Sequence, residues 1–391
     1  MKPASRERGF SIVELMVAVA IGLVLMLAVT GVLLRNEGRN RDSLAVNDIG
    51  QSGAYAAYLL DSAVRSAGTG FGLADDGWFG GSSKVVGCRV NAKKAGATIL
   101  PRSAAWPAPF AGFPQTIRVA PVIIGKGQSA SGSDVIAVMR GNAGAGEAVI
   151  QTQGGTLGTP LGLINTLGMS ANQVLLLADS GNDCLLLQTG TPAADTVPLT
   201  GSGDFHTTTS ANRDVDDFTS ANDSVVFNLG NAGASGGTPT SPPLFTLYGV
   251  GANRTLFALD MLGIEEGGVM PIAEGVVEMR ALYGLDTDWD STIDTWQDPG
   301  TGNFTAANLL DGSGAAQSRL SQIVAVRIGL ILRTANAERG TVAPASLVLF
   351  SDLGATLQQT RTLATADRNY RHRTVEVTVP LRNVLMCCDR P

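Results

Sequence analysis

Gly-Phe-Ser-Ile-Val-Glu, residues 9–14, joins a short basic leader to a long apolar run, and this junction decides how the chain is built. The leader, residues 1–9, carries three basic side chains and one acid. The run from Leu15 to Leu34 contains no charged residue, and about 20 apolar residues are enough for a helix to cross a membrane. Glu14 lies at the edge of this run, where a charge is costly unless a partner neutralises it. The junction therefore predicts a membrane helix whose carboxylate needs a partner.

Two simpler interpretations leave part of this junction unexplained. A secretory signal peptide has an apolar region of about 7 to 15 residues before a small-x-small cleavage site. Here the run is longer, and the nearby triplet of that kind, residues 18–20, lies inside it. A plain membrane anchor would explain the length of the run. It would not explain Glu14 or the glycine five residues before it.

The order of basic leader, glycine, hydrophobic residue, glutamate and apolar run resembles the class III signal of type IV prepilins and type II secretion pseudopilins. The resemblance implies that a prepilin peptidase cuts after Gly9 and methylates the new amino terminus at Phe10. The apolar helix then stays in the mature protein, with Glu14 as its fifth residue. In that family this glutamate pairs with the amino terminus of a neighbouring subunit, which would satisfy both charges and fix the axial register.

The orientation in the membrane follows from the resemblance rather than from charge. Three basic residues precede the helix and three follow it, Arg35, Arg39 and Arg41, so the positive-inside rule is nearly balanced. The resemblance puts the leader in the cytoplasm and the rest of the chain in the periplasm. It implies a single-pass protein of the bacterial inner membrane that later enters a pilus filament or its tip. All the cysteines lie beyond the apolar run, in keeping with an oxidising compartment.

The helix is predicted to continue beyond the membrane. Residues 35–66 contain no proline, and small or apolar residues recur at helical spacings: Leu44, Ile49, Ala56, Leu60, Ala63 and Ala67. A helix from Phe10 to Arg65 would be about 80 Å long at 1.5 Å per residue. The predicted organisation is a leader (1–9), a membrane part (10–34), an amphipathic continuation (35–66) and a head (67–391).

The head is predicted to be rich in β-strands, which gives an α+β fold with a pilin-like head. Period-2 alternation indicates half-buried strands at Ile323–Arg333 and Thr374–Leu381. Residues 251–254 predict a hairpin turn, and the compositions of 230–243 and 300–318 predict exposed loops, the first a candidate subdivision of the head. The other predicted strands are Ile117–Ile124, Asp134–Met139, Gln173–Ala178, Cys184–Gln188, Ser224–Leu229, Leu244–Val250 and Thr255–Leu259.

Composition narrows the function classes. The chain has a net charge of -6, and loss of the basic leader would make it more acidic. A non-specific nucleic-acid binder would show a basic patch, so we expect no nucleic-acid partner. The two histidines, His206 and His372, have no catalytic motif around them, and no nucleophile elbow or phosphate-binding loop occurs. The sequence therefore predicts a protein that is not an enzyme.

Patches near both ends of the chain narrow the resemblance to the PilW minor pilins. Residues 273–284, 323–328 and 373–383 resemble the carboxy-terminal pattern of that family, and Val64–Gly68 resembles its helix end. Residues 73–265 match nothing that we recognise. The resemblance implies a minor pilin that takes part in type IV pilus assembly and twitching motility, in a priming or tip complex with other minor and major pilins. A type II secretion pseudopilin and a tip-located adhesin-like binding module are the alternatives.

An acidic loop suggests a calcium site. Asp286, Asp288, Asp290 and Asp294, with the backbone carbonyl of Thr292, have a spacing that can converge on one hard cation. Two positions depart from an EF-hand loop: Ser291 replaces the glycine, and Gln297 replaces the closing glutamate. An acidic surface turn between two strands would explain the same residues without a metal. Calcium therefore enters as a hypothesis.

Four cysteines, Cys88, Cys184, Cys387 and Cys388, allow three pairings. We favour a disulfide between Cys88 and Cys184. It would close a loop of nearly 100 residues and stabilise the fold by about 4 to 5 kcal/mol in the chain-entropy model. The adjacent Cys387 and Cys388 could bond to each other, pair with the other two or stay free.

Overall fold

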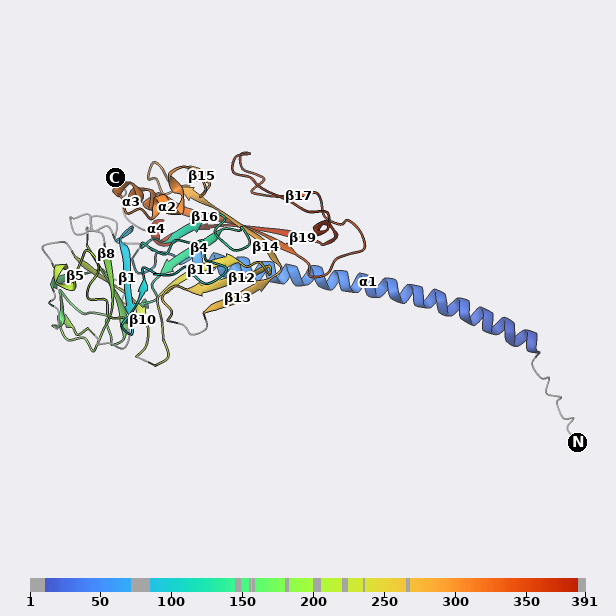
Figure 1. The fold of residues 1–391 in the computed structure, drawn as a ribbon, viewed down its shortest axis with the longest axis horizontal. Coiled ribbons are helices and arrows are strands. Elements are labelled where there is room, and N and C mark those ends of the chain that lie inside the picture. The colour runs from blue at the N-terminus through green and yellow to red at the C-terminus, as the bar shows by residue number, and fades with distance from the viewer. Residues whose placement is uncertain are drawn as a thin grey trace, which may run out of the picture.

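The computed structural model describes most of the chain. The described residues are 11–71, 85–144, 149–154, 156, 159–179, 183–199, 205–219, 224–234, 236–264 and 268–385. Gly9, Phe10, Cys387 and Cys388 lie outside them. One long helix leads into a head made mostly of β-strands (Figure 1). The α+β fold class predicted from the sequence is confirmed.

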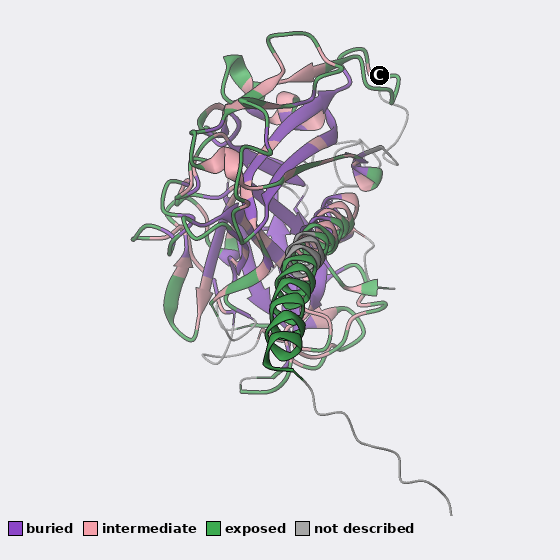
Figure 2. Ribbon diagram, turned by 90° about the vertical axis from the view of Figure 1, so that its right-hand side faces the viewer, coloured by how far each residue is buried: buried purple, intermediate pink, exposed green. Residues whose placement is uncertain are grey.

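Helix α1 runs from Ile12 to Arg65. Its 54 residues span about 80 Å at 1.5 Å per residue. Ser11 caps the helix, because its Oγ accepts a hydrogen bond from the amide of Val13 at 3.4 Å and satisfies one of the free donors of the first turn. The segment Ile12–Leu33 has a mean hydropathy of 2.8. It projects away from the head with its side chains exposed (Figure 2).

The second half of α1 packs against the head along one face. Ala56, Leu60 and Val64 are fully buried, and Ile49 and Ala63 are nearly so. This face contacts β13, β16 and β19 of the head, whose bounds are given below. The amphipathic continuation predicted from helical spacing therefore has the expected buried side.

Leu44 does not share this environment, and its prediction as a core residue is wrong. It is 68% exposed because it lies more than one turn before Ile49, where the buried face of α1 begins. Farther along, Gly53 permits close approach to the sheet. A Cβ atom at Gly53 would lie 3.1 Å from Leu332 Cδ1 and 3.2 Å from Val375 Cγ2.

The sheet that packs on α1 is antiparallel and has the order β15-β14-β16-β19. Along the outer strand, Val375, Val377 and Val379 are less exposed than the residues between them. The half-buried strand predicted there is confirmed, with shifted ends. The strands are β15 (Thr295–Gln297), β14 (Val276–Leu285), β16 (Ile323–Arg333) and β19 (His372–Pro380).

Strand β16 has the predicted bounds but not the predicted polar face. Ten of its residues are buried and only Arg327 is intermediate. The face of β16 that was predicted to be polar is covered by the segment that contains a short two-stranded sheet. This sheet consists of β17 (Ser346–Leu349) and β18 (Gln359–Thr362). Ile331 packs there in a small cluster with Leu349 and Phe350.

A second antiparallel sheet has the order β13-β12-β11-β4-β3. The predicted hairpin turn after β11 is confirmed, since the amide of Gly251 donates to the carbonyl of Thr255 at 2.9 Å. Strand β3 is shorter than predicted and begins after Pro121, which has no amide to donate. The strands are β13 (Val269–Glu274), β12 (Thr255–Asp260), β11 (Leu244–Val250), β4 (Val135–Arg140) and β3 (Val122–Gly125).

A third sheet, which we call the distal sheet, lies at the end of the head farthest from the free end of α1 (Figure 1). Its order is β2-β1-β8-β7-β10-β5-β6-β9, with β1 and β8 parallel. It consists of β1 (Arg89–Lys94), β2 (Ala97–Leu100), β5 (Ile150–Gly154), β6 (Leu161–Leu163), β7 (Gln173–Ala178), β8 (Asp183–Gln188), β9 (Thr196–Val197) and β10 (Val225–Asn231).

Both faces of the distal sheet are buried. Leu176 and Leu186 point into the main core of the head, whereas Leu175, Leu177 and Leu185 belong to a second cluster on the opposite face. All six residues of β7 are buried, as are all six of β8. This explains why these strands read as continuous apolar runs rather than as alternating ones.

The structure differs in part from the exposed loops predicted over residues 230–243 and 300–318. Residues 232–243 connect β10 to β11, but Gly230 and Asn231 still belong to β10. The expectation of an exposed loop over 300–318 is wrong in part, because Thr305 and Ser313 cap short helices whose Leu309 and Ala316 are buried. The short helices of the head are η3 (Val215–Asp217), η5 (Gly302–Phe304), α2 (Ala306–Leu309), α3 (Gly314–Ser321), η6 (Asp367–Asn369) and α4 (Arg382–Leu385).

Candidate functional site

The first half of α1 is the largest unpartnered apolar surface among the described residues. Every side chain from Ile12 to Leu33 is exposed. Monomeric soluble proteins rarely expose contiguous apolar patches of more than a few hundred Å². A membrane or other helices must therefore cover this segment.

Glu14 lies in the first turn of this exposed segment. There its carboxylate faces the positive end of the helix dipole, which favours an anion. The side chain is exposed, and it has no ion pair within the described part of the chain. Gly9 and Phe10, the predicted processing residues, precede the described region. Among the described residues, Glu14 is therefore an exposed carboxylate without an ion pair at the start of an exposed apolar helix.

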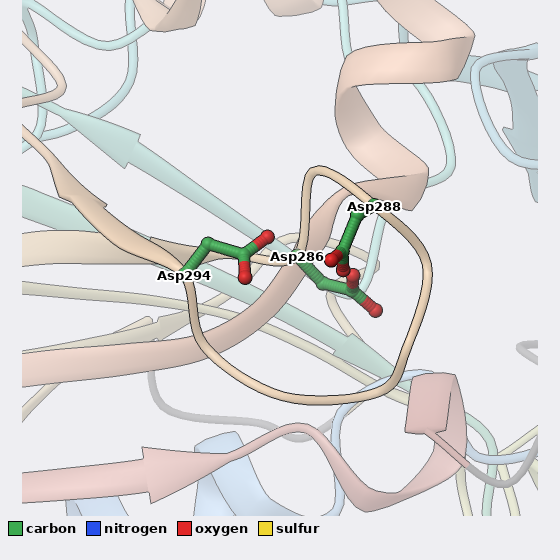
Figure 3. A group of neighbouring side chains, drawn as sticks. All are labelled: Asp286, Asp288 and Asp294. Carbon is green, nitrogen blue, oxygen red and sulfur yellow. The ribbon is translucent and has the colours of Figure 1, made fainter.

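The acidic loop after β14 brings three of its four aspartates together (Figure 3). One carboxylate oxygen from each of Asp286, Asp288 and Asp294 lies within 4.8 Å of the other two. Asp290 is not part of this group. Its Oδ1 accepts hydrogen bonds from the amide and the hydroxyl of Thr292, at 2.8 and 2.6 Å. The sequence thus predicted five ligands. The structure brings the carboxylates of three of them close together.

The backbone of this loop explains how the three carboxylates meet. Asp286 is fully buried and accepts from the amides of Asp290 and Ser291 at 3.2 and 2.9 Å. Ser291, which replaces the EF-hand glycine, has a φ of 69° and therefore adopts the left-handed conformation that favours glycine. Hydrogen bonds from the hydroxyl and amide of Thr287 lower the pKa of Asp294, so this carboxylate stays charged.

A disulfide joins Cys88 to Cys184, the pairing favoured from the sequence. Their Cα atoms lie 5.7 Å apart, and both residues are buried. The bond fastens the start of β1 to its parallel neighbour β8. Beside it, the Arg89 guanidinium and the Asp183 carboxylate form an ion pair at 2.6 Å. Together the disulfide and the ion pair hold the start of β1 against β8 within the distal sheet.

A buried ionic network that the sequence analysis missed joins the second sheet to the sheet on α1. Arg280 of β14 bridges Asp134 at 2.9 Å and Glu278 at 2.6 Å, and Arg361 of β18 reaches the other oxygen of Glu278 at 3.0 Å. Burial raises the pKa of Asp134, while the charges of Lys126 and Arg280 oppose this shift. No sequence motif marks these residues, because they lie far apart along the chain.

The two histidines do not form a catalytic site. His206 lies in the segment that follows the distal strand β9, and His372 begins β19. Burial lowers the pKa of His372, and the charge of Arg333 lowers it further. Nδ1 of His372 lies 3.0 Å from the carbonyl oxygen of Tyr370. Among the described residues, neither imidazole has a side-chain hydrogen-bond partner.

Comparison with known proteins finds similarity at both ends of the chain. Residues 4–30 match the prokaryotic N-terminal methylation motif, and residues 248–383 match the type IV pilus-assembly protein W family. The second match covers the sheet that packs on α1 and also reaches β11 and β12 of the second sheet. All strands of the distal sheet lie between the two matched regions.

Individual proteins show little similarity to this chain. No curated protein matches the chain. Among solved structures, a type IV-like pilin from Thermus thermophilus is similar at 12% sequence identity and a TM-score of 0.22. That similarity covers 55% of this chain and 87% of the other one.

Proposed function

We propose that this PilW-like type IV pilin acts as a minor pilin in the assembly of a type IV pilus, in a priming or tip complex. The observation that carries the proposal is the bare apolar segment Ile12–Leu33 with the free carboxylate of Glu14 at its start. The matches to the methylation motif and to the PilW family support the same function. The role is structural, and no catalytic step is assigned.

The apolar helix has two successive environments in this proposal. Before assembly it lies in the bacterial inner membrane with the head in the periplasm, since its length suits the hydrocarbon core. After assembly it lies among the helices of other minor and major pilins in the filament. Both environments cover the surface that the isolated chain leaves exposed, so the segment stays shielded from water throughout.

Processing prepares the charge pair. Cleavage by the prepilin peptidase after Gly9 would expose the amino group of Phe10, and methylation would keep that group positively charged. In the filament, Glu14 of one subunit would accept the amino terminus of its neighbour. A buried carboxylate without such a partner would be strongly disfavoured, so the pair selects one axial register among many that apolar contact alone would allow.

A second candidate function is binding at the filament tip. The distal sheet makes no extensive contact with α1 within the described residues, and all its strands lie outside the two matched regions. A part of the head that neither anchors nor assembles the subunit is free to contact a surface. The type II secretion alternative shares the amino-terminal motif, but the PilW match favours a pilus.

We also propose that Asp286, Asp288 and Asp294 hold a calcium ion. The support is their convergence within 4.8 Å and the oxygen ligands that calcium prefers. Calorimetric titration of the full chain with calcium tests this. Asp288→Asn should abolish the heat of binding, whereas the control Asp290→Asn, outside the group, should keep it. Absence of heat with the unchanged chain would refute the site.

Deletion of the gene tests the main proposal. We expect loss of surface pili and of twitching motility, with protein export unchanged, and full recovery when the gene is supplied again. Normal pili with lost attachment would instead support the tip-binding candidate. Impaired protein export with normal pili would support the secretion pseudopilin.

A further inference from the structure

A cavity lies against the distal sheet, away from α1. Its volume is about 330 Å³, near the lower end of the range of about 300–1,000 Å³ in which proteins bind small molecules. Three threonines, Thr156, Thr159 and Thr208, line it together with Pro160, Pro198 and His206. These residues come from the β5–β6 connection and from the chain that follows β9. None of them belongs to the regions matched to the methylation motif or to the PilW family.

The lining selects a neutral ligand. His206 is the only ionisable residue in the described lining, so the described part of the wall offers no fixed charge to bind an ion. Leu199 and Val215 provide apolar contact at the base, and both belong to the second hydrophobic cluster of the head. Threonine hydroxyls offer both donors and acceptors. This combination suits a ligand that has several hydroxyl groups and an apolar face.

Two polar groups of the cavity wall lack partners. Nδ1 of His206 is buried and has no hydrogen-bond partner within the described residues. The hydroxyl of Thr208 also makes no hydrogen bond to the described part of the chain, although its backbone carbonyl accepts from the amide of Val215 at 2.8 Å. Thr159 differs, because its hydroxyl donates to the carbonyl of Thr156 at 2.8 Å. A buried ring nitrogen without a partner is costly, so a bound hydroxyl group would stabilise His206. The hydroxyl of Thr208, on a half-buried residue, is open to the same ligand.

Backbone contacts and prolines hold the described part of the wall. The amide of His206 donates to the carbonyl of Lys93 at 3.0 Å, and His206 also bridges to Leu187 of β8. The prolines restrict the backbone on the opposite side. A preformed site loses less entropy when it binds a ligand than a flexible one does.

We propose that this cavity binds one ring of a neutral saccharide. Thr208 and His206 would hydrogen-bond to its hydroxyl groups, and Pro198 and Leu199 would contact its apolar C–H face. The biological use of such binding rests on the proposed function, because it requires the head to face the outside of the cell. Binding itself does not depend on pilus assembly and can be measured on the purified protein.

The test uses the full chain purified in lauryldimethylamine oxide, a detergent without a sugar group. Saturation-transfer NMR and calorimetry would measure binding of D-glucose, D-galactose, D-mannose and N-acetyl-D-glucosamine. We expect at least one of them to bind, and Thr208→Val and His206→Phe each to weaken that binding about tenfold. Thr98→Val is the matched control, because Thr98 is exposed on β2, and it should leave the affinity unchanged.

Several results would overturn the proposal. They are a lack of binding by all four sugars, unchanged affinity in both cavity variants, or preferential binding of N-acetylneuraminic acid or inorganic phosphate over the neutral sugars. Circular dichroism of each variant would identify a folding defect, and Thr156→Val would then replace the affected variant. A protein that binds no sugar but still restores pili to the deletion strain would refute the cavity proposal alone.

Discussion

Arg280 of β14 and Asp134, the residue before β4, form an ion pair at 2.9 Å although 146 residues separate them. The Asp134 carboxylate is fully buried and also accepts from the amides of Gly127 and Ala281, both at 2.9 Å. One side chain therefore fastens the second sheet to the sheet that carries α1. The hydroxyls of Tyr283 and Ser133 join the same two sheets, since they accept from the amides of Ile124 and Met279.

Replacing Asp134 with alanine should destabilise the head strongly. The change leaves two amides without their acceptor and Arg280 with Glu278 as its remaining partner, and breaking a buried ion pair costs about 3–5 kcal/mol. Urea unfolding followed by circular dichroism would measure the loss. Asp352→Ala is the control, because Asp352 pairs with Arg327 but is 62% exposed on its side chain, and exposed ion pairs contribute little to stability. Equal costs for the two variants would contradict the assigned role of Asp134.

The disulfide between Cys88 and Cys184 should contribute measurably to stability. A sequence separation of 96 residues corresponds to about 4 to 5 kcal/mol in the chain-entropy model. Changing both cysteines to serine should lower the free energy of unfolding by a comparable amount, and reducing agent should then have little further effect. Peptide mapping without reduction should find Cys88 joined to Cys184. A map that joins Cys88 to Cys387 or Cys388 would be incompatible with this account.

A side chain at Gly53 should separate α1 from the sheet. Leucine there would collide with Leu332 and Val375, which leave little room even for a Cβ atom, and overpacking typically costs about 1–3 kcal/mol. Ala54→Leu offers a matched control on the exposed side of the same helical turn. Thermal unfolding of both variants should show a lower midpoint for Gly53→Leu alone. A similar shift in both would indicate that helix packing is not responsible.

Substitution of Gly9 by a bulky residue should prevent removal of the leader. The peptidase of the resembled family cuts after this glycine, so Gly9→Leu should leave a precursor that migrates more slowly in a gel. Mass spectrometry of the unchanged protein should find a methylated amino terminus at Phe10. A cleavage pattern that the substitution does not alter would show that the processing site lies elsewhere.

The sequence was sufficient for features encoded by local pattern. The absence of proline and the spacing of Ile49, Leu60 and their neighbours predicted α1, and apolar runs predicted β7 and β8. Most of the strands that were missed are short, but β14 has 10 residues and carries the polar Glu278 and Arg280 among its apolar ones. β2 has only four residues and follows a turn in which Ala95 and Gly96 both have positive φ. Pairing with β1 across this tight turn, at the edge of the distal sheet, makes this segment a strand.

Side-chain convergence was harder to predict than secondary structure. The acidic loop had a spacing that suggested five ligands, but the hydrogen bonds from Thr292 draw Asp290 out of the group. The partners Asp134 and Arg280 belong to different sheets, and nothing in either local sequence indicates the other. Likewise, the cavity beside the distal sheet arises where separate chain segments meet. Such features depend on tertiary packing, which periodicity does not encode.

The most direct test of the central claim is incorporation of the Glu14→Ala variant into filaments. Pili sheared from cells would be probed by immunoblot for the variant, and the membrane fraction would be examined for removal of the leader. We expect normal processing and normal amounts in the membrane, with little variant in the sheared pili, because the charge pair with a neighbouring subunit is lost. Normal incorporation of a correctly processed Glu14→Ala variant would contradict the proposed role of this carboxylate in assembly.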